Sequence, residues 1–157
     1  ENEIMNGTSD TLFSPNAELT RGMVVTILYR MEGEPATKSS DTFSDVEAGR
    51  YYSEAVEWAA ENSIVNGFTD GTFKPERAVT REQLASILCR YARFSGITTY
   101  EAELPANASV SNWATKDVAW AYAEGILTAV QTSAAAKNAN RAEVATAIYA
   151  HLTGTAK

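Results

Sequence analysis

The chain has 157 residues, of which 45% are apolar and 21% charged, and it contains one cysteine. A chain of this size and composition can bury a core without a framework of disulfides, which a single thiol excludes in any case. The formal charge of −7 argues against nucleic acids and anionic membranes as partners held by bulk attraction, and no apolar run is long enough to predict insertion into a membrane. An anionic partner would need local cationic sites.

The chain contains an internal repeat with a fixed offset of 60 residues. Residues 2–31 align with residues 62–91 without a gap, and 12 of these 30 positions are identical, where about two would agree by chance. A fainter third copy keeps this offset in its second half and matches at an offset of 62 in its first half. A two-helix unit cannot bury its apolar face alone, so we expect one domain over 1–157. Its parts are repeat 1 (1–33, second half only), repeat 2 (41–95) and repeat 3 (105–154).

Each complete copy is predicted to fold as helix, loop and helix. Copy one supplies the loop and a second helix that starts at Thr20. In copy two, Ser53 can cap a first helix that ends near Asn62, and the second helix starts at Thr80. Copy three follows the same order, and its second helix starts at Asn140. The second helices carry apolar stripes at helical spacing: Val24, Ile27, Leu28 and Met31; Leu84, Ile87, Leu88 and Tyr91; Val144, Ala147, Ile148 and His151.

The starts of the second helices match N-terminal capping patterns. Thr80 with Gln83, and Asn140 with Glu143, have the spacing of a capping box, in which each side chain binds the free backbone N–H of the other residue. Met23 stands in the second of these positions in copy one and cannot complete the box. We therefore expect the helix of copy one to have the weakest start.

An arginine follows the cap residue in every copy, at Arg21, Arg81 and Arg141. Its charge lies against the positive end of the helix dipole, which costs up to about 1 kcal/mol, so a group outside the helix must favour it. A salt bridge to a carboxylate of a neighbouring repeat, such as Asp45 or a glutamate, is one explanation. The other is an anion site, in which the guanidinium and free helix N–H groups bind the same carboxylate or phosphate. Both can hold in different copies.

The remaining reactive and aromatic residues have structural explanations. Cys89 and His151 lie on helix faces that pack, and Trp58 and Trp120 are expected to be half-exposed packing residues beside core valines. With one cysteine and one histidine, we expect neither a metal site nor a cofactor. The sequence shows no catalytic constellation and no nucleotide-binding signature, so we do not expect an enzyme.

Four motifs of the second copy resemble the S-layer homology (SLH) repeat. They are Phe43-Ser44-Asp45-Val46, the aromatic Tyr51 ahead of Val56, the loop from Gly67 to Pro75 with Asp70-Gly71-Thr72-Phe73, and Val79-Thr80-Arg81-Glu82. The resemblance covers nearly the whole chain as three tandem repeats. It implies an all-α, pseudo-threefold, three-pronged spindle around a shared helical core. It also implies a secreted protein, held non-covalently at the bacterial cell surface by an anionic, often pyruvylated, cell-wall polysaccharide.

The same resemblance implies which residues bind this polysaccharide in grooves between repeats. A pyruvate ketal presents one carboxylate, which an arginine at a helix start can bind, while an aromatic ring stacks on a sugar and a glycine lets the loop approach it. The implied set is Arg21, Arg81, Arg141, Thr20, Thr80, Asp45, Tyr51, Trp113, Gly7 and Gly67. Because copy two keeps the pattern best and copy three worst, we expect Arg81 in the most competent groove and Arg141 in the least.

Departures from the SLH pattern leave a second interpretation open. Copy one has Gly22-Met23 where the signature has Ala-Glu, and copy three lacks the Asp-Gly-Thr-Phe loop and has Asn140 in place of Thr. Degenerate repeats of this kind could form a structural or protein-protein interaction module that binds no polymer. In either case we expect the chain to be linked covalently to an upstream domain of a longer protein.

Overall fold

The computed structural model describes residues 14–38 and 41–153. This part of the chain is helical and contains no β-sheet, which confirms the expected all-α class. Its elements in chain order are α1 (Arg21–Met31), α2 (Ser53–Glu61), α3 (Arg81–Phe94), the 3-10 helix η1 (Asn112–Ala114), α4 (Thr115–Ala123), α5 (Ala129–Thr132) and α6 (Arg141–Thr153). No helix among these residues is long and apolar enough to cross a membrane.

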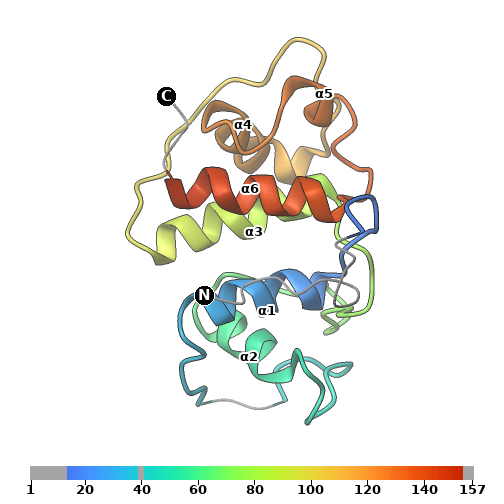
Figure 1. Ribbon diagram of the computed structural model, residues 1–157, viewed down its shortest axis with the longest axis vertical. Helices are drawn as coiled ribbons and strands as arrows, with labels where there is room; N and C mark the ends of the chain where they lie inside the picture. Colours follow the sequence, from blue (N-terminus) through green and yellow to red (C-terminus); the bar gives the residue numbers. More distant parts are fainter. Residues whose placement is uncertain (1–13, 39–40, 154–157) are drawn as a thin grey trace.

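The second helices of the three repeats, α1, α3 and α6, form the centre of the molecule. They run in the same direction, so their N-terminal ends gather at one end of the structure (Figure 1). The first helix of repeat 2, α2, packs on α1, and the first helix of repeat 3, α4, packs on α3. The apolar stripes face inward as predicted, and Val24, Leu28, Leu84, Leu88 and Val144 are fully buried. Each first helix thus covers the second helix of the preceding repeat.

A closed ring of backbone hydrogen bonds joins the three repeats just before their second helices. The N–H of Leu19 donates to the carbonyl of Ala139 (3.4 Å), that of Ala139 to Val79 (2.9 Å), and that of Val79 to Leu19 (2.9 Å). The three residues are 60 apart in the sequence, so equivalent positions meet in a threefold pattern at this point. The three-pronged spindle as an overall shape stays a prediction.

Local capping differs from the prediction at α2. The N-cap residue is Tyr52, which makes no side-chain cap bond, and Ser53 is the first helical residue. The expectation that Ser53 caps this helix is therefore wrong. Its hydroxyl instead accepts from the N–H of Arg50 (2.9 Å) and donates to the carbonyl of Glu47 (2.6 Å), which fixes the turn that leads into the helix.

The two tryptophans of the first helices are more buried than the sequence suggested. Trp58 is 3% exposed and Trp120 is 2% exposed, so their expected half-exposure is wrong and only their packing role is confirmed. Cys89 is buried in α3, and the half-buried His151 packs its ring 5.2 Å from that of Tyr91. Both residues therefore have the packing roles that were predicted.

Candidate functional site

The backbone N–H groups at the starts of α1, α3 and α6 all have protein partners. In each case, the first two N–H groups of the helix donate to carbonyls in the loop of another repeat. The pairs are Arg21 to Arg77 (2.9 Å), Gly22 to Pro75 (2.8 Å), Arg81 to Lys137 (2.9 Å), Glu82 to Ala135 (2.9 Å), Arg141 to Ala17 (2.8 Å) and Ala142 to Pro15 (3.0 Å). An anion site made of free helix N–H groups is therefore excluded at these starts, because neighbouring repeats already supply the acceptors.

The third N–H group of each helix is bound by the cap residue, as predicted. The N–H of Gln83 donates to the Thr80 hydroxyl (3.2 Å), and the Gln83 side chain accepts from the Thr80 N–H (3.3 Å). Asn140 and Glu143 form the same reciprocal pair at 2.9 and 3.1 Å. Thr20 accepts only from the N–H of Met23 (3.2 Å). Both capping boxes are thus confirmed, and the start of α1 has only half of one.

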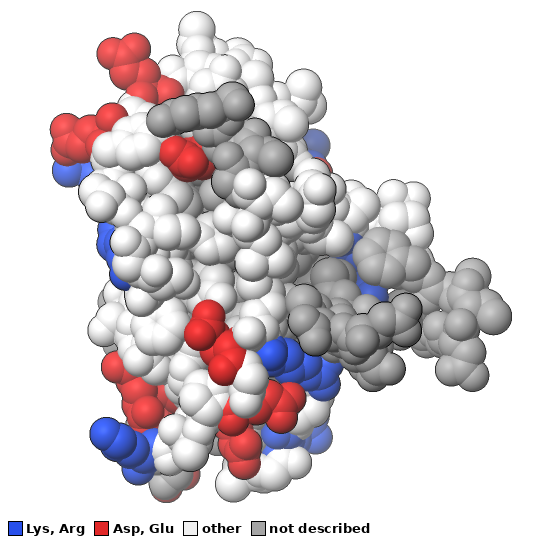
Figure 2. Space-filling view, turned by 60° about the vertical axis from the view of Figure 1, so that its left-hand side comes forward, with Lys and Arg blue, Asp and Glu red and all other residues white. Residues whose placement is uncertain are grey.

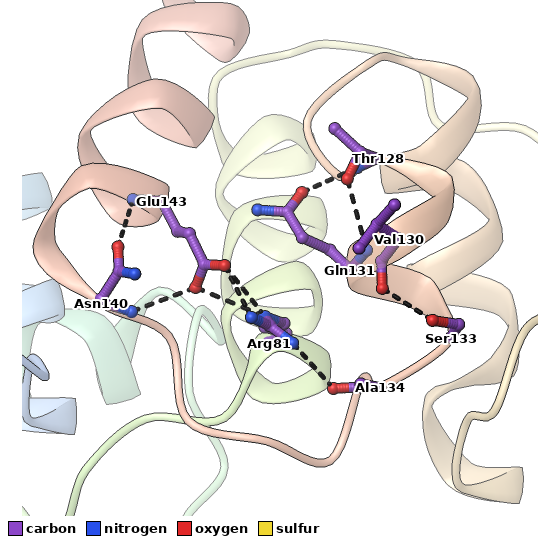
Figure 3. Close-up of polar contacts among 8 residues, drawn as sticks. All are labelled: Arg81, Thr128, Val130, Gln131, Ser133, Ala134, Asn140 and Glu143. Carbon is purple, nitrogen blue, oxygen red and sulfur yellow. Dashed lines mark hydrogen bonds and ion pairs between the residues drawn. The ribbon is translucent and has the colours of Figure 1, made fainter. Parts of the chain in front are cut away.

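The Arg81 side chain is engaged in a salt bridge between repeats 2 and 3 (Figure 3). Its Nη2 and Nε groups donate to the carboxylate of Glu143 at 2.7–3.3 Å, and its Nη1 group donates to the carbonyl of Ala134 (3.2 Å). Burial alone would raise the pKa of Glu143, but the hydrogen bonds from Arg81 and from the backbone of Asn140 outweigh it and lower that pKa. For Arg81, the salt-bridge explanation is the correct one, with Glu143 as the partner.

Arg21 lies in a different environment, between aromatic rings. It is 7% exposed, its Nε group donates to the carbonyl of Phe73 (2.8 Å), and its guanidinium lies 4.8 Å from the centre of the Phe68 ring and 4.6 Å from that of Phe73. Burial, followed by the nearby charge of Arg77, lowers the pKa of Arg21 to about 10. The group is thus still a cation at neutral pH, and the nearby Asp45 carboxylate, which raises its pKa, offsets part of its charge without a direct ion pair.

Arg141 is largely buried, and the Asp45 carboxylate holds a loop in place. Arg141 is 8% exposed at the start of α6. Both carboxylate oxygens of Asp45 accept backbone N–H groups of the repeat 2 loop, from Phe73 and Lys74, each at 2.7 Å. Asp45 therefore holds the loop that in turn binds the start of α1, and it is not the hydrogen-bonded partner of Arg21.

Two exposed aromatic side chains stand beside equivalent helix starts. Tyr51 is 55% exposed, and its hydroxyl interacts with that of Thr20, the N-cap of α1. Trp113 is 58% exposed and lies in η1, which packs against α3. The two residues correspond at an offset of 62. The structure thus brings each predicted aromatic to a junction between repeats, with its ring accessible to a ligand.

Gly67 has a structural reason to be glycine that needs no ligand. Gly67 has a positive φ of 61°, and a Cβ at this position would lie 2.3 Å from the Phe43 ring and 2.9 Å from the carbonyl oxygen of Thr72. The turn and the packing of Phe43 therefore already require glycine, without any sugar. Gly7 lies outside the described residues.

Two exposed cations at the same junctions were missed by the sequence reasoning. Arg77 and Lys137 belong to the loops whose carbonyls bind the starts of α1 and α3, and both side chains are exposed. No described carboxylate forms an ion pair with either of them. They are related by the repeat offset of 60 residues, and this equivalence is the signal that could have identified them.

Charge is otherwise distributed without a dominant patch on the face shown in Figure 2. Acidic and basic side chains are intermixed there and large areas carry no charge, so attraction of a polyanion by this face as a whole is not favoured. Among the described residues, no three His, Cys, Asp or Glu side chains are grouped to hold a metal ion.

Comparisons with known proteins agree with the repeat pattern. The family model of the S-layer homology domain matches residues 1–22 and 42–85. The chain is 32% identical to an amylopullulanase of Thermoanaerobacterium thermosulfurigenes over 155 residues, which are 93% of this chain and 8% of that protein. It is 26% identical to a cellulosome-anchoring protein of Acetivibrio thermocellus over 91 residues, 55% of this chain and 20% of that protein. It is also 48% identical to the outer membrane protein SlpA of Thermus thermophilus over 48 residues, 31% of this chain and 5% of that protein.

Proposed function

This chain belongs to the S-layer homology family, and from that premise we propose that it anchors a longer secreted protein to the bacterial cell wall. The ligand is an anionic cell-wall polysaccharide, and the binding sites are the junctions between repeats. The chain spans no more than a fifth of the relatives named above, two of which are named for an anchoring role or an outer-membrane location. The third relative, the amylopullulanase, is named for an enzymatic activity, and we assign that activity to parts of it outside the matched region.

The observation that carries this proposal is the pairing of an exposed aromatic ring with cations at a junction. At the first junction, Tyr51 stands beside Thr20 at the start of α1, where Arg21 and Arg77 lie close enough to repel each other. A flat ring can pack against the apolar face of a pyranose. A carboxylate on that sugar, such as a pyruvate ketal, would relieve the repulsion between the two guanidinium groups.

We propose that the first junction binds the ligand more strongly than the second, which differs from the order expected from the sequence. At the second junction, Trp113 is equally exposed, but the Arg81 guanidinium is already neutralised by Glu143. A ligand carboxylate would have to displace Glu143 from a bidentate salt bridge, or bind Lys137 alone. We therefore propose that Arg21 and Arg77 serve the principal anion site, and that sugar stacking contributes more than charge at Trp113.

Sedimentation with purified wall sacculi tests this function. The chain is expected to sediment with sacculi that carry pyruvylated polymer and to stay in solution after mild acid removes the ketal. Tyr51→Ala should weaken binding by roughly tenfold, while Tyr149→Ala, which removes an equally exposed tyrosine from α6, should not change it.

Arg77→Ala with Arg30→Ala as its control tests the cationic part of the site. Both substitutions remove one exposed or half-exposed arginine, but Arg30 lies in the last turn of α1, away from the junction. Equal losses from the two variants would refute the anion site at the first junction. Failure of the parent chain to sediment with either kind of sacculi would instead support the alternative, a repeat module that binds no polymer.

A further inference from the structure

In the described part of the chain, α6 is the one second helix that no first helix covers. The first helix α2 packs on α1, and α4 packs on α3, whereas the helix that packs on α6 is α3 (Figure 1). The three second helices are equivalent by sequence and by the ring of hydrogen bonds before their starts. The face of α6 that corresponds to the covered faces of α1 and α3 can therefore be identified residue by residue.

Side chains that are buried in α1 have identical but exposed counterparts in α6. Tyr29 is 6% exposed, whereas Tyr149, which is equivalent to it at twice the repeat offset, is 65% exposed. Thr26 is buried and its equivalent Thr146 is exposed. The hydroxyls of both threonines donate to the carbonyl four residues earlier in their own helix, each at 2.8 Å. The two faces thus carry the same groups in the same local geometry and differ in whether a helix covers them.

This uncovered surface, the α6 face, has the composition of a surface that is buried. Residues 144–153 contain no Asp, Glu, Lys or Arg, although a helix face that stays in water normally carries charged side chains. By helical spacing, the α6 face consists of Ala142, Ala145, Thr146, Tyr149 and Leu152. All five are exposed or half-buried. An uncharged, partly aromatic stripe of this kind indicates a surface that receives another structural element.

The contacts of Tyr29 define the chemistry of the element that fits this face. The Tyr29 ring packs 5.7 Å from that of Trp58 in α2, and the Tyr29 hydroxyl donates to the carboxylate of Glu54 in the first turn of α2 (3.3 Å). Glutamate and tryptophan four residues apart lie on one face of a helix. In α3 the equivalent of Tyr29 is Cys89, so the α6 face with its tyrosine matches a helix of the α2 type rather than the α4 type.

We propose that the α6 face binds an amphipathic helix of the α2 type, which the longer protein carries directly before Glu1. At the repeat offset of 60, Glu1 is equivalent to Glu61, the last residue of α2, so the segment before it has the register of a first helix. This helix packs a tryptophan on the Tyr149 ring and accepts a hydrogen bond from the Tyr149 hydroxyl through a glutamate, and it thereby joins repeat 1 to repeat 3. The α6 face lies on a different helix from the junctions with Tyr51 and Trp113, so the inference does not depend on polysaccharide binding.

Extension of the chain by a second copy of residues 50–60, placed directly before Glu1, tests this proposal. The copy contains α2 except for its last residue, for which Glu1 stands in register. We expect the urea midpoint to rise by roughly 1 M, because the added helix buries the apolar α6 face. The reactivity of Tyr149 toward hydroxyl radicals, mapped by mass spectrometry, should fall roughly tenfold, in proportion to the exposed fractions of Tyr149 and Tyr29. The reactivity of the exposed Trp113 should not change.

Two controls separate a docked helix from a general effect of added residues. The same extension with serine in place of the copied Val56 and Trp58 should change neither the urea midpoint nor the reactivity of Tyr149. Tyr149→Ala should leave the midpoint of the parent chain unchanged, because its side chain is exposed there, but should remove most of the gain in the extended chain.

A free peptide of residues 50–60 at millimolar concentration provides a second measurement, made on the parent chain, that does not depend on how the extension folds. It should slow the radical reaction of Tyr149 and leave that of Trp113 unchanged. Unchanged Tyr149 reactivity in both the extended chain and the peptide mixture would overturn the proposal, as would an equal rise of the midpoint with the serine-containing extension. Sedimentation velocity of the parent chain should show a monomer, because a dimer that Tyr149→Ala abolishes would make a second copy the occupant and would also overturn it.

Discussion

Removal of the salt bridge between Arg81 and Glu143 should measure how strongly repeats 2 and 3 are coupled. The side chains of the pair are 18% and 16% exposed and share a bidentate contact with a shortest distance of 2.7 Å. Arg81→Met keeps most of the aliphatic stem, and Glu143→Gln keeps the capping box, because Gln83 serves that purpose in repeat 2. Both substitutions therefore remove the ionic contact with little loss of packing.

The expected coupling lies between that of an exposed and that of a buried pair. Hydrogen bonds to charged groups contribute about 1.5–3 kcal/mol, and exposed pairs contribute less than about 1 kcal/mol. For a pair that is mostly but not fully buried, we expect a coupling free energy of about 1–2 kcal/mol. Each single variant should lower the free energy of unfolding by about 2 kcal/mol, since it also leaves the remaining charged group without its partner.

Urea denaturation of the parent, both single variants and the double variant gives this coupling as a double-mutant cycle. The folded-state pKa of Glu143 is lowered, so the contribution of this carboxylate is fully present above its unfolded pKa of about 4.3 and is lost as pH falls through the lower folded value. A coupling below about 0.4 kcal/mol at pH 7, or one that persists after Glu143 is protonated, would refute the assigned role of the pair.

Three further substitutions or measurements check the loops and the core. Gly67→Ala should lower the free energy of unfolding by more than about 2 kcal/mol, because it adds a clash with Phe43 to a left-handed backbone. Gly49 has a φ of 82° and open space around it, so Gly49→Ala should lower it by about 1 kcal/mol in thermal or urea unfolding. Asp45→Asn leaves one oxygen for two loop N–H donors and should cost about 1–3 kcal/mol, as measured by the shift of the urea midpoint; an unchanged midpoint would contradict this. Burial raises the pKa of Cys89 to about 12, so a thiol reagent at pH 8 should label the chain only as fast as it opens or unfolds; immediate labelling of folded protein would contradict the packing.

The repeat register was predictable because it depends on local patterns. The apolar stripes define the inward faces of the second helices, and the cap residues Thr20 and Thr80 define where α1 and α3 begin. The offset of 60 residues also identifies, in advance, the equivalent positions that meet in the ring of hydrogen bonds before these helices. That these positions form hydrogen bonds with one another could be learned only from the structure.

The partners of the helix starts were not predictable, because they come from other repeats. The carbonyl that accepts from Arg81 N–H belongs to Lys137, and the one that accepts from Arg141 N–H belongs to Ala17. Nothing near either helix in the sequence indicates these acceptors. Glu143 was recognised as a capping residue from its spacing, but its second role as partner of Arg81 arises only when repeats 2 and 3 pack together. The short helices η1 and α5 likewise have no counterpart among the predicted elements.

The structure explains why an arginine can follow the cap against the preference of an isolated helix. Carbonyl oxygens of a neighbouring repeat converge on each helix start and compensate the positive end of the dipole. The guanidinium groups of Arg21 and Arg81 donate to two further carbonyls of the same loops, from Phe73 and Ala134. The arginine therefore fastens one repeat to the next, and this role needs no ligand.

The starts of α1 and α3 differ in the other groups that contact the guanidinium of Arg21 or Arg81. Arg81 meets the carboxylate of Glu143, so its charge is balanced within the protein. Arg21 contacts two aromatic rings and lies near the charges of Arg77 and Asp45, but no described carboxylate forms an ion pair with it. A chain with a net charge of −7 can thus attract an anion only where its own carboxylates leave a cation uncompensated. Of the two arginines at the starts of α1 and α3, Arg21 is the one without an ion pair to a described carboxylate, and it lies at the first junction, beside Tyr51.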